Sequence, residues 1–156
     1  MSFKRSISGR KAKRTGQAFE NIIEVEASRS NMVILRIPDG CKQVSSSNFI
    51  RIKSPFDFVL VCKKTEKTLF FDAKSTSANT FSPPLIKPHQ LNALSKFSGL
   101  DKIKTGYIVN FEKHCKVVFF TYNQLKNSMV TRKGLKPDDG ISLGHKHLID
   151  FRNLFL

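Results

Sequence analysis

The apolar runs FDFVLVC at 56–62 and TLFFDAK at 68–74 decide the fold that this sequence predicts. A polar segment, KKTEK at 63–67, separates the two runs. Aromatic and β-branched residues on either side of a short polar turn are typical of a β-hairpin. The runs therefore predict two neighbouring strands, one of which carries Asp57 and the other Asp72.

The order Asp72-Ala73-Lys74 puts a carboxylate and an ammonium side by side, because residues i and i+2 of a strand project from one face. Such a pair is a poor way to build a core. It suits a divalent metal beside a phosphate ester, since hard cations such as Mg²⁺ prefer carboxylate oxygens. We interpret Asp57, Asp72 and Lys74 as such a site. A salt-bridged pair on a solvated strand face is the alternative for Asp72 and Lys74, and a turn residue for Asp57.

The rest of the chain predicts strands interrupted by helices. The expected elements are a helix at 16–29, a strand at 33–37, a strand or extended segment at 49–53, a helix that Pro88 opens, a strand pair at 106–111 and 116–121, and helices at 122–130 and 148–156. This order favours an α/β fold in which helices flank a small mixed β-sheet. One domain at 16–156 is expected, since the length fits a single core.

The charge predicts the partner. The 156 residues include 27 Lys and Arg against 12 Asp and Glu, a net charge of +15, which favours a polyanion. Residues 1–15 carry no acid, and we expect a flexible arm that contacts DNA phosphates with little sequence preference. A solvated tail is the alternative. The basic residues of the arm are Lys4, Arg5, Arg10, Lys11, Lys13 and Arg14.

The cysteines and the hydropathy pattern predict a cytoplasmic protein, in a bacterial cell or a phage-infected host. Cys41, Cys62 and Cys115 are odd in number and widely spaced, as reduced thiols are. Neither an export signal nor a stretch of membrane-spanning length is found in the sequence, so no membrane partner is expected. His145, His147 and the pair at 114–115 match no standard zinc spacing, which predicts surface or DNA-facing positions for them.

Several motifs, taken in order, resemble the PD-(D/E)xK nuclease superfamily. They are Gly16-x-x-Phe19-Glu20, Ser54-Pro-x-Asp57, Asp72-x-Lys74 and His89-Gln90. Within that superfamily the block FDAKST at 71–76 and the strand that begins GY at 106–107 look most like Holliday-junction resolvases of the RecU type. The likeness covers roughly residues 16–125. It implies a restriction-endonuclease-like fold and a Mg²⁺-dependent endonuclease, with Mn²⁺ as a possible substitute.

The resemblance also implies roles for single residues. Lys74 would orient or deprotonate the attacking water, and Gln90 would support the site from the following helix. Glu20 would complete the acidic cluster, although an exposed carboxylate is the alternative, and Gln90 could be only a helix-start residue. The implied metal ligands are Asp57, Asp72, the carbonyl of Ala73, and Glu20. The reaction would be hydrolysis of a phosphodiester by an activated water.

The predicted DNA surface extends beyond the arm to residues near the proposed site. Those expected to contact DNA are Lys42, Arg51, Lys53, Ser75 and Lys87, and Lys63, Lys64 and Lys67 are expected to widen the surface. RecU-type resolvases resemble one another in a long basic projection before the metal-binding strands. The corresponding segment here, 38–53, is shorter and serine-rich.

Three functions remain open on the sequence. The first is a structure-selective endonuclease that acts on four-way or branched DNA in recombination and repair, as a homodimer because two symmetric cuts need a two-fold axis. The second is a nuclease of the same superfamily that acts on other DNA in repair, phage-genome processing or restriction. The third is a basic DNA-binding protein without catalysis.

Overall fold

The computed structural model describes the backbone of residues 3–156 and the side chains of residues 14–156. Seven strands form one mixed sheet in the order β1-β4-β5-β6-β7-β8-β9. Their bounds are β1 (Val33–Arg36), β4 (Phe58–Cys62), β5 (Lys67–Thr76), β6 (Ile103–Phe111), β7 (Lys116–Thr121), β8 (Ile141–His145) and β9 (Leu148–Ile149). Only β5 and β6 pair in parallel. The predicted α/β fold with a mixed sheet flanked by helices is confirmed.

The predicted hairpin supplies the second and third strands of this sheet. Strands β4 and β5 are antiparallel, with Phe58 opposite Phe71 at one end and Cys62 opposite Lys67 at the other. The rings of Phe58 and Phe71 stack with their centroids 5.3 Å apart, and both side chains are fully buried. Cross-strand aromatic pairs of this kind fix the register of a hairpin. The same register fixes where Asp57 and Asp72 lie.

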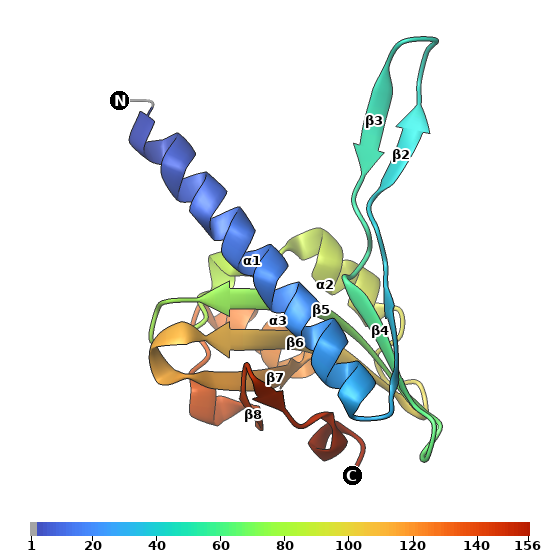
Figure 1. The fold of residues 1–156 in the computed structure, drawn as a ribbon, viewed down its shortest axis with the longest axis vertical. Helices are drawn as coiled ribbons and strands as arrows, with labels where there is room; N and C mark the ends of the chain where they lie inside the picture. Colours follow the sequence, from blue (N-terminus) through green and yellow to red (C-terminus); the bar gives the residue numbers. More distant parts are fainter. Residues whose placement is uncertain (1–2) are drawn as a thin grey trace.

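Helices cover the two faces of the sheet (Figure 1). Helix α1 (Phe3–Arg29) packs Phe19, Ile23 and Ala27 onto one face. Helices α2 (Pro88–Ser95) and α3 (Tyr122–Thr131) belong to the second core cluster on the opposite face. Short 3₁₀ turns complete the chain at η1 (Pro83–Leu85), η2 (Glu112–His114), η3 (Pro137–Asp139) and η4 (Phe151–Leu154). The two buried clusters share the sheet between them.

A second hairpin projects from this body. Strands β2 (Gly40–Gln43) and β3 (Phe49–Ile52) pair only with each other, and all their residues are exposed. The ribbon rises from the same end of the molecule as the N-terminal half of α1, and the two diverge (Figure 1). The segment 38–53, which the sequence marks as a shortened projection, therefore forms a two-stranded arm.

Most expected bounds differ from the structure by a few residues, and the expectations for the two ends of the chain differ by more. Helix α1 begins at Phe3 rather than near residue 16, so most of the basic arm continues the helix; its expected flexibility stays a prediction. The helix expected at 148–156 is wrong, because 148–149 form β9 against β8, which the sequence did not predict. Gly144, with φ of 94°, allows this tight return, since a Cβ there would lie 2.6 Å from the carbonyl oxygen of Leu148.

Membrane insertion finds no support in the helices. None of those in the part of the chain that the structure describes is long and apolar enough to cross a membrane.

Candidate active site

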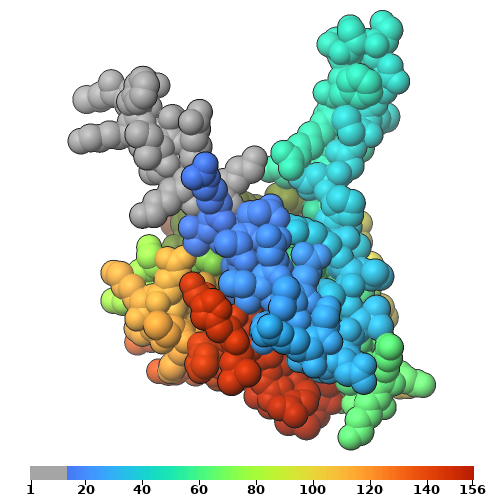
Figure 2. Space-filling view, viewed as in Figure 1, coloured from blue at the N-terminus to red at the C-terminus, as the bar shows by residue number. Residues whose placement is uncertain are grey.

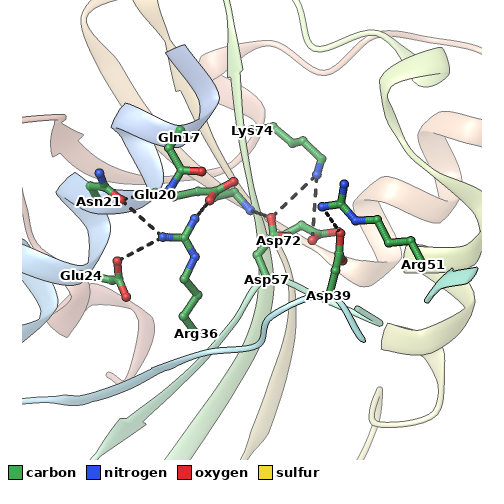
Figure 3. Close-up of polar contacts among 11 residues, drawn as sticks. Gln17, Glu20, Asn21, Glu24, Arg36, Asp39, Arg51, Asp57, Asp72 and Lys74 are labelled. Atoms are coloured by element: carbon green, nitrogen blue, oxygen red, sulfur yellow. Dashed lines mark hydrogen bonds and ion pairs between the residues drawn. The ribbon is translucent and has the colours of Figure 1, made fainter. Parts of the chain in front are cut away.

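Three side chains from the central hairpin meet at one end of the sheet. The Nζ atom of Lys74 lies 3.9 Å from Oδ2 of Asp57 and 3.9 Å from Oδ1 of Asp72. Figure 3 shows the ammonium above the two carboxylates. The structure therefore brings together the three residues that the sequence singles out, as the register of the β4–β5 hairpin requires.

Asp57 is held by the backbone around it. Its N–H donates to the carbonyl of Phe71 at 3.2 Å, its carbonyl accepts from Ile37 at 2.8 Å, and its Oδ2 accepts from the N–H of Ala73 at 3.0 Å. Phe56 and Phe58 on either side of it are buried in different core clusters. These contacts hold the carboxylate of Asp57 in position in the absence of a ligand. They argue against the alternative that Asp57 is only a turn residue.

Asp72 is fully buried, and neither of its carboxylate oxygens has a hydrogen-bond partner among the described residues. Burial raises the pKa of Asp72 to about 8; the nearby Lys74 opposes this shift, and the carboxylate of Asp57 adds to it. A buried carboxylate without partners costs free energy unless a cation or a proton compensates it. The solvated salt bridge is thus excluded for Asp72, because its exposure is zero.

Behind these charges lies a buried pair that the sequence predicted only in part. Tyr107, opposite Asp72 in the β5–β6 register, is fully buried and donates its hydroxyl to Oε1 of Gln90 at 3.1 Å. Its ring lies 5.4 Å from Nζ of Lys74, within cation–π range. Burial, and then the charge of Asp72, raises the pKa of Tyr107. Gln90 thus contacts the site through Tyr107 rather than directly, and His89 is exposed.

Glu20 faces the same cleft but already has a partner. Arg36 of β1 forms an ion pair with Glu20, and its other nitrogen lies 3.4 Å from Glu24 and 3.3 Å from Oδ1 of Asn21 (Figure 3). The Arg36 guanidinium also lies 5.7 Å from the ring centroid of Phe58. Glu20 therefore links α1 to the edge of the sheet. Its role as a metal ligand stays a prediction.

A cleft of about 810 Å³ is lined by Glu20, Asp57 and Lys74, and the buried Asp72 lies behind it without lining it. It runs between α1, the base of the β2–β3 hairpin and the ends of β4 and β5, and Ser75 lines it beside Lys74. At the base of the hairpin, Nη2 of Arg51 lies 2.6 Å from Oδ2 of Asp39. The N–H of Ser54 donates to Asp39 at 2.8 Å, and this bond, with help from Arg51, lowers the pKa of Asp39. Arg51 is thus tied to the hairpin base.

The other residues predicted to bind DNA lie in three places. Lys42 and Lys53 are exposed on or beside the projecting hairpin, and Lys87 is exposed at the N-terminus of α2. Arg14 is exposed on α1, whereas Lys4, Arg5, Arg10, Lys11 and Lys13 lie outside the described side chains. The expectation for Lys63, Lys64 and Lys67 near the site is wrong, because the β4–β5 turn points them to the opposite end of the hairpin from Asp57.

Two carboxylates and one backbone carbonyl make a donor set that fits a divalent metal. A site built from side chains alone is not found, because among residues 14–156 no three His, Cys, Asp or Glu side chains group closely enough to hold a metal ion. Asp57 and Asp72 supply two hard oxygen donors, and the carbonyl of Ala73 between Asp72 and Lys74 is available as a backbone ligand. The oxygens of Asp72, which accept no hydrogen bond from the described residues, are the observation that favours this fit, because burial disfavours the ionised carboxyl despite the Lys74 ammonium 3.9 Å away.

Comparison with known proteins now bears on the site. The family model of RecU, Recombination protein U, matches residues 17–139, which include Glu20, Asp57, Asp72 and Lys74. The chain belongs to the RecU family. This is a family of Holliday-junction resolvases, so the resemblance seen in the sequence is confirmed.

Two further comparisons complete the picture. A search among curated proteins found no match. A solved structure of Hjc from Archaeoglobus fulgidus, described as a Holliday junction resolvase from an archaeal hyperthermophile, is similar with a TM-score of 0.49 and 16% identity. The similarity covers 69% of this chain and 78% of that chain.

Sequence reasoning missed Arg36, Asp39 and the role of Tyr107. Arg36 pairs with Phe58 in the β1–β4 register, next to Asp57, but that register is not readable from the chain alone. Asp39 looks like a turn residue in the string Pro38-Asp39-Gly40. The one available signal was the pair Gly106-Tyr107, which the RecU likeness included without a reason for the tyrosine.

Proposed function

We propose that this RecU-family protein is a divalent-metal-dependent endonuclease that cuts four-way or branched DNA in recombination and repair. The observation that carries the proposal is Asp72, a fully buried carboxylate without a hydrogen-bond partner, with Lys74 3.9 Å away. A buried carboxyl group without hydrogen bonds lowers the stability of a protein, so its presence here indicates that it binds a ligand. The cleft beside it, of about 810 Å³, is lined by Asp57 and Lys74, which would face a DNA backbone there.

Asp57, Asp72 and the carbonyl of Ala73 would hold the metal, Mg²⁺ or Mn²⁺. When bound, the metal supplies Lewis-acid activation of water and neutralises charge on the phosphate. The hydrogen bond from the N–H of Ala73 to Asp57 fixes one carboxylate relative to the other. Preorganised ligands of this kind avoid reorganisation during the reaction.

Lys74 would act on the water and on the phosphate. Its ammonium lies at equal distances from both carboxylates and over the ring of Tyr107, so its position is set from three sides. From there it can orient the attacking water and donate to a nonbridging oxygen as charge develops. The ring of Tyr107, whose hydroxyl is hydrogen-bonded to Gln90, lies 5.4 Å from this ammonium and helps to position it.

The β2–β3 hairpin is placed to contact a branched DNA substrate. It projects next to the cleft, and its base joins the cleft through Asp39 and Arg51. Lys42 and Lys53 are exposed on it, so a DNA arm that enters the cleft would meet positive charge on this side. Two symmetric cuts across a four-way junction would need a second copy, and we therefore propose a homodimer.

A cleavage assay tests the proposal. Purified protein with Mg²⁺ would be incubated with a labelled four-way junction, a flap, a nicked duplex and a linear duplex. The wild type should cut the junction first, and Asp72→Asn should cut nothing while binding DNA. Asp101→Asn, an exposed aspartate outside the cleft, is the matched control. Cleavage by Asp72→Asn at the wild-type rate would overturn the proposal.

One observation favours a second candidate, a nuclease that acts on other DNA. Arg51, one of three basic residues of the hairpin segment, is paired with Asp39 and so contributes less charge to a junction. A linear duplex cut as fast as the junction in the same assay would favour this candidate. The proposed metal chemistry at Asp57 and Asp72 would be unchanged.

A further inference from the structure

A second cavity, of about 730 Å³, lies beside the cleft but contains none of the proposed catalytic residues. It is formed by α1, the end of β6, η2 and the β8–β9 turn, on the side of α1 away from the β2–β3 hairpin (Figure 2). Thr15 and Glu112 line both cavities, so the two are contiguous. A DNA strand that leaves the cleft on this side would enter the second cavity.

The rim of this cavity is cationic. Arg14 on α1 and Lys146 on the β8–β9 turn are exposed and line it, with His145 and His147 beside them. Glu112 is the one acidic residue of the lining. Exposed cations from two separate elements that converge on one opening suit a phosphate group. His145 and His147, which match no zinc spacing, are exposed, as expected for surface positions, and a DNA-facing role for them stays a prediction.

The floor is different, because it is neutral and polar. Asn110 of β6 lines the cavity with only 4% of its surface exposed. Its neighbour in the β5–β6 register is Ser75, which lines the cleft and whose Oγ is buried without a hydrogen-bond partner among the described residues. A side-chain amide carries both donors and an acceptor. The floor of the cavity therefore presents a neutral hydrogen-bonding group to a ligand.

We propose that this cavity binds one unpaired nucleotide of the DNA strand, with its phosphate at the rim and the edge of its base at Asn110. Charge at the rim and a neutral donor–acceptor group at the floor match the two ends of a nucleotide, whereas a bare phosphate would leave the amide unused. Ala18 and Cys115 in the walls are small, and the volume is that of an ordinary ligand pocket. The inference rests on the proposed function, because it takes DNA as the substrate.

The path of the strand follows from the sheet. Lys74 and Ser75 are consecutive on β5, and Ser75 lies beside Asn110 on β6. Consecutive side chains of a strand project to opposite faces, so the link between the proposed scissile phosphate and the nucleotide pocket is the lining that the two cavities share at Thr15 and Glu112. A base has to leave its stack to present an edge at the floor, and this cost is smallest for a nucleotide that is already unpaired, as at a branch point.

The thiol of Cys115 can be used to test whether a nucleotide occupies the cavity. Cys115 lines the cavity and is exposed, Cys62 is buried, and Cys41 on the hairpin can be removed by Cys41→Ser. Maleimide labelling of Cys115 would be followed by peptide mass spectrometry, with metal chelated so that no DNA is cut. A junction that contains an unpaired nucleotide should slow the labelling several-fold, and a fully paired duplex should slow it less. Equal labelling rates with and without bound junction would overturn the proposal.

Variants separate the two ends of the nucleotide. Lys146→Gln should weaken DNA binding in fluorescence anisotropy and lower the salt slope by about one. Asn110→Leu should keep that slope but lower the preference for the unpaired nucleotide by about tenfold, the worth of a lost base-edge pair. Lys64→Gln, an exposed lysine at the far end of the β4–β5 hairpin, is the control and should bind as wild type.

The outcomes are distinct from those of the cleavage assay. Binding by Asn110→Leu with unchanged preference would overturn the base contact, and binding by Lys146→Gln with an unchanged salt slope would overturn the phosphate contact. Thermal unfolding of Asn110→Leu checks its fold, and the Cys115 labelling needs no change at Asn110. A wild type that cuts no DNA contradicts the proposed function, whereas a wild type that cuts while these variants match Lys64→Gln contradicts the pocket alone.

Discussion

Glu20 lines the cleft and Asp72 is buried next to it, and the fold treats the two carboxylates in opposite ways. Asp72 is fully buried and has no hydrogen-bond partner, while Glu20 is partly exposed and ion-paired with Arg36 (Figure 3). Both are acidic residues that a metal could use. One carries a charge that the fold does not compensate with a hydrogen bond, and the other is already part of a network that joins α1 to β1.

The difference shows how a ligand site can be told from a structural ion pair. Glu20 does not need a metal to balance its charge, because it already forms an ion pair with Arg36. An unsatisfied and buried carboxylate such as Asp72 lowers the free energy of unfolding until a cation or a proton arrives. The proposed chemistry therefore depends on Asp72 far more than on Glu20.

The largest expected effect comes from removing the charge of Asp72. Asp72→Asn should abolish cleavage of the four-way junction, whereas Glu20→Gln should lower the rate only about 10–100-fold, the range for a supporting group. Single-turnover rates with Mg²⁺ would measure both. Because burial raises the pKa of Asp72 to about 8, the native state opposes ionisation of this carboxyl at neutral pH, so Asp72→Asn should also raise the melting temperature of the metal-free protein. Equal rate losses in the two variants would break the contrast between the two residues.

Removal of the ammonium should have the next largest effect. Lys74→Met keeps the apolar stem over Tyr107 but removes the group that orients water, so the rate should fall about 10²–10⁴-fold. Metal binding, followed by calorimetry, should be retained because both carboxylates remain. Lys64→Met, at the far end of the same hairpin, is the control. If Lys74→Met cut DNA at the wild-type rate, another residue would have to orient the attacking water.

The sequence predicted the centre of the site better than its surroundings. Asp57, Asp72 and Lys74 were readable because they lie on one hairpin, where strand periodicity and a short turn determine which side chains meet. The partner of Glu20 was not readable, since Arg36 reaches it through the packing of α1 on the edge strand. Contacts between distant elements depend on register, and one residue of slip changes the face.

The same limit explains the errors in the fold. The end of the chain, 148–156, was expected to be helical, but Gly144 turns the chain so that β9 pairs with β8. Gly106 shows the converse. A Cβ there would lie 2.0 Å from the carbonyl oxygen of Phe120, so the strand β7 can approach only a glycine. The sequence carried this signal, but its cause needs the neighbouring strand.

A change of pH sharpens the comparison through stability. The native pKa of Asp72, about 8, is above its unfolded value of 3.8, so the native state holds the proton more tightly. Stability from this group is present below the unfolded pKa and is lost as pH rises toward about 8. In metal chelator, the wild type should lose stability relative to Asp72→Asn between pH of about 5 and about 8, as thermal unfolding would show. A constant difference between the two proteins across this range would contradict the shift.

The ion pair of Glu20 gives the smallest effect, and a double-mutant cycle measures it. Glu20→Gln, Arg36→Met and the double variant should give a coupling of about 1 kcal/mol in the free energy of unfolding, because the pair is partly exposed and Arg36 also has Glu24. Asp101→Asn combined with Arg36→Met is the control and should show additivity. A Glu20 that serves as a metal ligand would behave differently, since the coupling would fall when Mg²⁺ is added and Glu20 exchanges Arg36 for the metal. A coupling that is unchanged by Mg²⁺ would place Glu20 with the structural ion pairs and leave the metal to Asp57 and Asp72.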